Sequence, residues 1–163
     1  MSSLHLFGAP FGVSFFLVVC LLLIGCPVHA EDGVVRLSVE GSDFRLAREA
    51  LYEVIEAEGM VVGNVLPFGQ MLARTGAGQA NPYREAEIVQ FCSASLAHRM
   101  VGEDAGQIVF CPLVIALYVT ADKPELVVMA YRAPGDDTPA RAQASALLGR
   151  LVERAARLAK LRW

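Results

Sequence analysis

The spacing of apolar and polar residues beyond the first 30 positions changes between the strand period and the helix period. A short β-branched run at residues 34–40 predicts a first strand. Apolar residues at helical spacing over 44–55 predict a helix after it. Ser42 or Asp43 can cap the start of this helix, and Gly59 is placed to end it. The folded part of the chain is therefore predicted to open with a strand and a helix.

The remaining pattern predicts more strands and two further helices. Strand-like apolar runs occupy residues 60–68, 87–92, 108–120 and 126–132, with an interruption or bulge at Pro112. Helical segments are a short turn within 69–81, a helix from Ser93 or Ser95 to Glu103, and a continuous helix at 140–163. The order β-α-β-β-α-β-β-α predicts an α+β fold with helices packed on one face of an antiparallel sheet.

The first 30 residues contain no lysine, arginine, aspartate or glutamate, and they carry an apolar run at 13–24. This run is too short to cross a bilayer comfortably but has the length of the apolar part of a signal peptide. Small residues precede Glu31 at the two positions that a signal peptidase reads. We predict a signal peptide at 1–30, which exports a single domain at 31–163 to the periplasm or the medium.

The leader also allows two alternative interpretations. Leu23 to Cys26 resembles a lipobox, in which Cys26 is lipidated and becomes the mature N-terminus. An uncleaved leader would instead hold the protein at the membrane. All three interpretations predict export and differ in whether the domain is anchored.

The charged residues all lie beyond the leader, and the formal net charge is −3. This acidic balance argues against nucleic acid as a general partner. The final helix differs, because it carries six basic residues against a single acidic one, Glu153. Its apolar stripe and basic side are typical of a helix packed on a sheet and also of one lying on an anionic membrane surface. A membrane contact through 140–163 therefore remains an alternative.

Two cysteines follow the leader, Cys92 at the end of one predicted strand and Cys111 at the start of the next. If these strands pair antiparallel, both sulfur atoms lie at the same end of the sheet and form a disulfide candidate. The alternation of neighbouring residues instead points Cys111 inward and Cys92 toward the less apolar face. Two unpaired buried thiols and a redox site therefore stay open as alternatives.

A metal or haem site is a weaker alternative for the same region. Cys92, His98, Met100 and Cys111 are soft ligands that suit copper(I), and a subset suits haem iron. Their spacing matches no established metal motif, and the helical pattern places His98 at the surface. No cofactor is predicted, and copper or haem is kept only as an alternative.

Several stretches resemble the domain of unknown function 302 (DUF302) family. The resemblance rests on residues 87–93 (EIVQFCS), 108–112 (IVFCP), 116–118 (ALY), 127–131 (VVMAY) and the closing helix rich in leucine and alanine. It covers roughly residues 34–163 and implies a compact α+β fold and self-association, here as a homodimer. It implies no activity and no catalytic residues. Many members have a different pair at the position of Cys92 and Ser93, so a thiol role does not follow from the resemblance.

The chain lacks the usual signatures of enzymatic chemistry. It has no Gly-x-Ser-x-Gly elbow and no phosphate loop, and His98 is the single histidine beyond the leader. We therefore predict an exported binding or interaction module, with a groove between the sheet and the final helix for a small ligand or a second copy. The alternative is a periplasmic thiol-redox, metal-handling or haem-handling protein that uses Cys92 and Cys111. Enzymatic activity is left open.

Overall fold

The computed structural model describes residues 33–162 of the chain. The predictions for the leader, namely the signal peptide at 1–30, cleavage before Glu31 and lipidation of Cys26, lie outside the described residues. They remain predictions.

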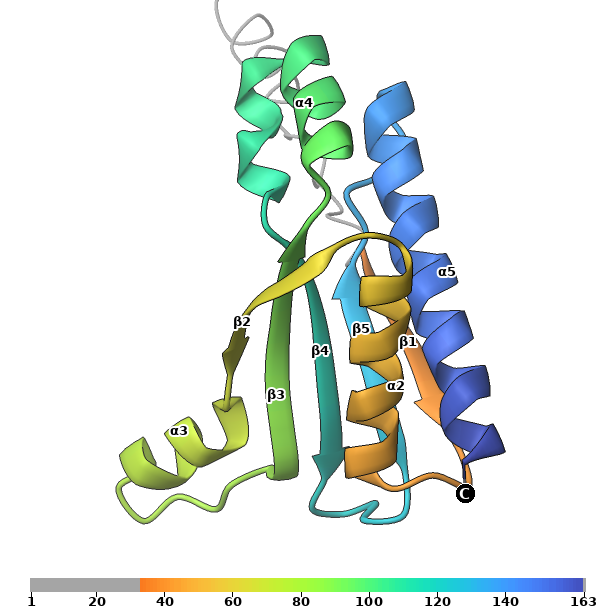
Figure 1. The fold of residues 1–163 in the computed structure, drawn as a ribbon. Helices are drawn as coiled ribbons and strands as arrows, with labels where there is room; N and C mark the ends of the chain where they lie inside the picture. The colour runs from red at the N-terminus through yellow and green to blue at the C-terminus, as the bar shows by residue number, and fades with distance from the viewer. Residues whose placement is uncertain (1–32, 163) are drawn as a thin grey trace, which may run out of the picture. The chain divides into compact units, whose positions relative to one another are not determined.

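Five strands form one sheet in the order β1-β5-β4-β3-β2 (Figure 1). The strands are β1 (Val34–Val39), β2 (Val61–Leu66), β3 (Tyr83–Cys92), β4 (Leu113–Thr120) and β5 (Val127–Arg132). Every neighbouring pair runs antiparallel, which confirms the predicted α+β class and the antiparallel sheet. Along the central strand β4, buried residues alternate with more exposed ones, as expected where one face of the sheet is covered.

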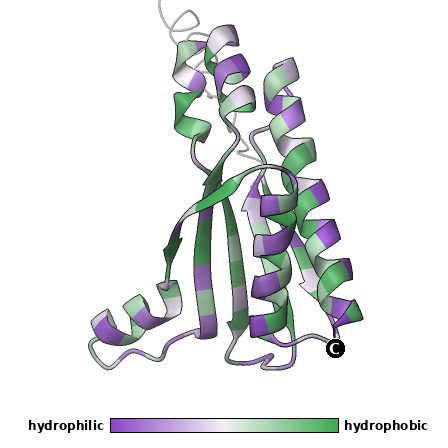
Figure 2. Ribbon diagram, viewed as in Figure 1, coloured by the Kyte–Doolittle hydropathy of each residue, from purple (hydrophilic) through white to green (hydrophobic). Residues whose placement is uncertain are grey.

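Two long helices, α2 (Phe44–Ala57) and α5 (Pro139–Leu161), cover one face of the sheet (Figure 1). Both helices show hydrophobic and hydrophilic residues in alternating bands in Figure 2, as amphipathic helices do. Their apolar sides meet the sheet in one hydrophobic core, which includes Leu51, Ile115 and Leu151, each fully buried.

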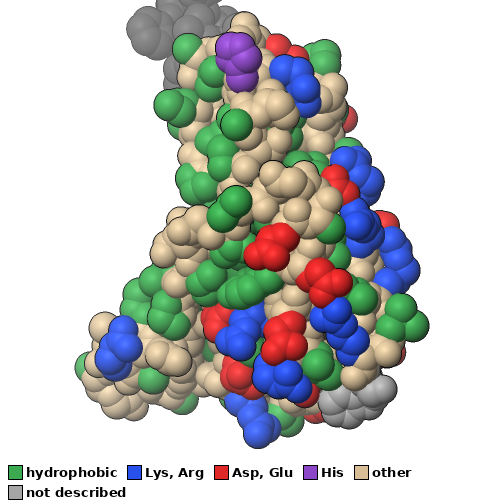
Figure 3. All heavy atoms as spheres, in the orientation of Figure 1, with side chains coloured by type: hydrophobic (Ala, Val, Ile, Leu, Met, Phe, Trp, Pro, Cys, Tyr) green, Lys and Arg blue, Asp and Glu red, His purple; other side chains and the backbone are tan. Residues whose placement is uncertain are grey.

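The basic side of α5 is matched by glutamates of α2 and its C-terminal end. Arg154 forms an ion pair with Glu58, and Arg162 forms one with Glu53. Figure 3 shows side chains of both charges gathered over this pair of helices. The core and these ion pairs engage both sides of the amphipathic α5, and a membrane contact through this helix stays a prediction. Among residues 33–162, no helix has the length and apolar character needed to cross a bilayer.

Three shorter segments refine the predicted order. The helix α3 (Phe68–Thr75) stands where a helical turn was expected, and α4 (Ala94–Glu103) follows β3 as predicted. A 3-10 helix, η2 (Ala105–Phe110), precedes β4. The prediction of a strand over 108–120 is therefore wrong in its first part, because β4 begins at Leu113.

Local hydrogen bonds and a proline set the start of β4. The Asp104 carboxylate accepts a hydrogen bond from the Gly106 N–H at 2.9 Å, which starts η2. The last turn of η2 closes where the Cys111 N–H donates to the Ile108 carbonyl at 3.0 Å. Pro112 has no N–H to donate to a strand ladder, so pairing with β3 starts one residue later. An apolar run of this length does not distinguish a 3-10 turn from a strand.

The N-cap of α2 yields a stability prediction. The Asp43 carboxylate accepts a hydrogen bond from the Leu46 N–H at 2.7 Å. Asp43→Ala should lower the free energy of unfolding by about 1 kcal/mol, as measured by chemical denaturation. Ser93 is the matched control, since it stands at the same position before α4 but its side chain makes no capping hydrogen bond. An equal loss in Ser93→Ala would contradict the capping explanation.

Candidate functional site

The ends of β3 and β4 bring Cys92 and Cys111 together. Phe91 pairs with Leu113 at this end of the ladder, and the two cysteines lie just beyond that pair. The pKa of the Cys111 thiol is raised first by burial and then by the Cys92 thiol, as expected for neighbouring groups at this end of the β3–β4 ladder. The antiparallel pairing required for this juxtaposition is present. The inward direction expected for Cys111 does not apply, because Cys111 precedes the regular strand.

The two thiols have different surroundings. Cys92 is exposed, whereas Cys111 is half-buried, and both are free thiols in this structure. Burial raises the pKa of the Cys111 thiol, and the neighbouring Cys92 raises it further. Cys92 is therefore the more accessible sulfur of the pair. The disulfide between them stays a prediction.

The other two residues proposed as metal ligands, His98 and Met100, differ from the cysteine pair in their burial. Met100 is fully buried in the hydrophobic core, and His98 is exposed on α4. Within residues 33–162, no three histidine, cysteine, aspartate or glutamate side chains gather in a way that could hold a metal ion. The proximity of Cys92 and Cys111 is thus the part of the set that the fold brings together.

A hollow of about 390 Å³ lies between α4 and α5, next to the end of α2 and the start of β2. We call it the α4–α5 groove. It is lined by Glu58, Met60, Ser93, Leu96, Arg99, Gln143, Ala146, Leu147 and Arg150. The volume falls in the range of sites that take small ligands.

Hydrogen bonds fix the two walls of the α4–α5 groove relative to each other. The Glu103 carboxylate, at the end of α4, accepts a hydrogen bond from the Ala140 N–H in the first turn of α5 at 3.0 Å. The Gln107 side-chain amide of η2 donates to the Thr138 hydroxyl, the N-cap of α5, at 3.3 Å. The groove therefore lies between elements that are tied together at one end.

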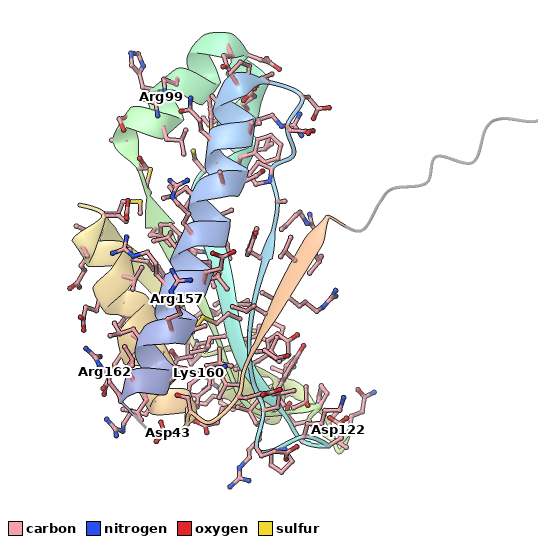
Figure 4. The ribbon with its side chains drawn as sticks, turned by 90° about the vertical axis from the view of Figure 1, so that its right-hand side faces the viewer. Asp43, Arg99, Asp122, Arg157, Lys160 and Arg162 are labelled. Carbon is pink, nitrogen blue, oxygen red and sulfur yellow. The ribbon has the colours of Figure 1, made fainter. Side chains whose placement is uncertain are left out.

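Basic side chains dominate the rim of the α4–α5 groove. Arg99 projects from α4 beside α5 (Figure 4), and Arg150 extends from α5 itself. Within residues 33–162 neither arginine forms an ion pair. Glu58, the acidic side chain of the lining, is engaged by Arg154. The groove thus combines an apolar floor with two guanidinium groups that lack an acidic partner.

From the sequence we expected a groove between the sheet and the final helix, whereas the α4–α5 groove is lined by α4, α5 and the segment after α2. Arg150 was visible as part of the basic side of that helix. Arg99 carried no signal, because its place in the lining depends on the packing of α4 against α5, two helices that are far apart in the sequence. Ser93 was recognised only as a helix cap.

A cluster of titratable groups under α2 has a structural explanation. Glu87 of β3 accepts hydrogen bonds from the Arg48 guanidinium and the Tyr52 hydroxyl, each at 3.3 Å. Burial, followed by the charge and hydrogen bond of Glu87, raises the pKa of Tyr52 to about 12. Tyr52 therefore stays protonated at neutral pH and ties α2 to the sheet.

A second hollow of about 730 Å³ lies at the loops beside Phe44. Its polar lining is largely acidic, with Glu40, Asp43, Glu85 and Glu125 against Arg84. Asp43 is already occupied as the N-cap of α2. The α4–α5 groove differs from this hollow in charge, because the charged side chains of its lining that form no ion pair within residues 33–162 are both arginines, Arg99 and Arg150.

Residues 35–158 match the family described as Domain of unknown function DUF302. The chain belongs to the DUF302 family. The family resemblance predicted from sequence is thereby confirmed. The fold is also similar to the crystal structure of an uncharacterized conserved DUF302 protein from Bacillus stearothermophilus, with 16% sequence identity and a TM-score of 0.61. That similarity covers 77% of this chain and 97% of the other. No curated protein matches the chain.

The two thiols of this DUF302 domain should differ in the pH dependence of alkylation. A raised pKa leaves less thiolate at a given pH, so Cys111 should react with iodoacetamide more slowly than Cys92 near neutral pH. Cys92→Ser removes one cause of the shift and should move the Cys111 profile to lower pH, although burial keeps part of the shift. Mass spectrometry of the labelled peptides measures both rates. An unchanged Cys111 profile in Cys92→Ser would show that the two thiols do not interact.

Proposed function

We propose that this DUF302 protein is a binding module whose α4–α5 groove takes a small ligand with an apolar body and a carboxylate group. The observation that carries the proposal is the pairing of an apolar floor with two unpaired arginines at the rim. The proposed function is binding and includes no catalytic step.

The apolar part of the ligand would rest on Met60, Leu96 and Leu147. These residues belong to the hydrophobic core and are at most 8% exposed, so the floor is held rigid by the packing beneath it. A preformed floor favours binding, because the ligand can bind without reorganising the protein.

The anionic part of the ligand would be held by Arg99 and Arg150. A guanidinium group donates two parallel hydrogen bonds to a carboxylate, and such charge-assisted pairs are among the stronger hydrogen bonds in proteins. Ser93 and Gln143 add further hydrogen-bonding groups to the same lining. A neutral ligand would leave both charges without a partner, so the groove favours acids over the corresponding alcohols.

Binding of octanoate to the full chain, followed by isothermal titration calorimetry, tests this proposal. Arg150→Gln and Arg99→Gln should each weaken octanoate binding by about tenfold, because each removes a charge-assisted hydrogen bond. Ala146→Phe should also abolish binding, since Ala146 is an exposed lining residue whose enlargement fills the groove. Octanol should bind more weakly than octanoate and should not respond to the arginine substitutions.

The matched control is Arg74→Gln, which removes an exposed arginine on α3, outside the groove lining. Equal losses in Arg74→Gln and Arg150→Gln would indicate a nonspecific charge effect and overturn the assignment. Absence of binding by octanoate and by shorter carboxylates would overturn the ligand class. A dimer that Ala146→Phe converts to monomer would instead identify a second copy as the occupant of the groove.

A further inference from the structure

We infer that Cys92 and Cys111 form a thiol–disulfide exchange centre, and that its substrate is an accessible disulfide flanked by apolar groups. The inference does not depend on the α4–α5 groove or on its ligand. It rests on the adjacency of two sulfur groups at the ends of paired strands, on their unequal exposure, and on the apolar side chains that surround them.

The geometry allows a bond between the two sulfur atoms with little movement. Neighbouring strands lie about 4.8 Å apart, and a disulfide joins Cα atoms about 4.4 to 6.8 Å apart. Cys92 is the last residue of β3, and Cys111 lies two residues before β4. Both positions lie beyond the last paired residues of β3 and β4, Phe91 and Leu113, while Cys92 still pairs with Val61 of β2 on its other side.

Because the two thiols differ in exposure, we assign Cys92 and Cys111 different steps of the reaction. Cys92 is open to solvent and can meet an external disulfide, whereas Cys111 is half-buried behind it. A two-cysteine exchange site requires one sulfur that attacks the substrate and a second that resolves the mixed disulfide. Cys92 fits the first role and Cys111 the second. The assignment of these roles rests on the difference in exposure between the two thiols.

Apolar side chains surround the pair and are exposed to an unusual degree. Val61, which pairs with Cys92 across β2 and β3, is 76% exposed. Ile108 and Val109, on the turn that leads into Cys111, are 64% and 77% exposed. Figure 3 shows hydrophobic side chains at the surface of this part of the molecule. Exposed aliphatic groups around a reactive sulfur favour a disulfide carried on an apolar chain over a charged one.

The proposed reaction balances in two steps. The Cys92 thiolate attacks one sulfur of a substrate disulfide, forms a mixed disulfide, and releases one substrate thiolate that takes up a proton. Cys111 then loses its proton to solvent and attacks the Cys92 sulfur, which releases the second substrate thiol. The protein changes from two thiols to one disulfide, and the substrate changes from one disulfide to two thiols. The reverse sequence oxidises a substrate dithiol.

The test uses the full chain with Cys20→Ser and Cys26→Ser, so that Cys92 and Cys111 are its only thiols. The reduced protein is treated with an excess of glutathione disulfide and followed by mass spectrometry. The expected product is an intramolecular disulfide within one chain, with no stable adduct. Cys111→Ser should trap a glutathione adduct on Cys92, and Cys92→Ser should slow the formation of any adduct by about tenfold or more.

A second experiment tests which class of disulfide substrate reacts faster with the protein. A short disulfide-linked peptide with leucine beside each cysteine is compared with glutathione disulfide, and Val109→Asp is the variant. A faster reaction with the peptide, reduced by Val109→Asp, supports disulfides on apolar chains. Equal rates with both substrates and no effect of Val109→Asp would overturn the apolar part of the inference.

Two results would overturn the exchange centre itself. One is a glutathione adduct that stays on Cys92 although Cys111 is present. The other is a disulfide between two chains, with no disulfide formed within one chain. Circular dichroism of each variant confirms that it is folded. Octanoate binding is measured on the same Cys→Ser variants, since unchanged binding keeps a failure of the exchange centre distinct from a failure of the groove.

Discussion

The antiparallel pairing of β3 with β4 is the constraint on which both candidate sites depend. The chain leaves β3 at Cys92, forms α4 and η2, and returns to the neighbouring strand just after Cys111. Because the two strands are adjacent and opposite in direction, the segment between them, α4 and η2, must begin and end at the same end of the sheet. The pairing therefore places Cys92 and Cys111 at the same end of the sheet, just beyond the Phe91–Leu113 pair. The same segment carries α4 alongside α5, which creates one wall of the α4–α5 groove.

The segment of α4 and η2 is held in place by buried side chains and by a hydrogen bond to α5, as well as by the pairing of β3 with β4. Leu96 and Met100 of α4 belong to the hydrophobic core, so α4 is attached to the domain by buried side chains. At its far end, Glu103 caps the first turn of α5. An exposed helix with neither anchor would open easily, and the groove beside it would have no fixed width. The core and the cap together make the groove a preformed feature.

The sequence predicted the fold better than the sites, for identifiable physical reasons. Strand and helix patterns are local, so the α+β class followed from the periodicity, and the residue types before α2 narrowed its cap to Ser42 or Asp43, of which Asp43 makes the capping hydrogen bond. The start of β4 was misplaced, because an apolar 3-10 turn resembles a strand until the proline after it is considered. The sequence placed the cysteines at the same end of the sheet only on the condition that their strands pair antiparallel, and the structure supplies that condition. The presence of Arg99 and Arg150 in one groove could not be predicted, because it depends on how α4 and α5 pack, which periodicity does not encode.

The ion pairs between α2 and α5 stabilise the fold and also affect the charge of the α4–α5 groove. Glutamates at the end of α2 attract the arginines of α5, and Glu58 is taken by Arg154 although it also lines the groove. Had Glu58 been free, it would neutralise one of the rim arginines and repel an anionic ligand. Exposed ion pairs contribute little to stability, about 1 kcal/mol or less each. The Glu58–Arg154 pair is therefore expected to matter more for the local charge of the groove than for folding, since Arg99 and Arg150 form no ion pair within residues 33–162.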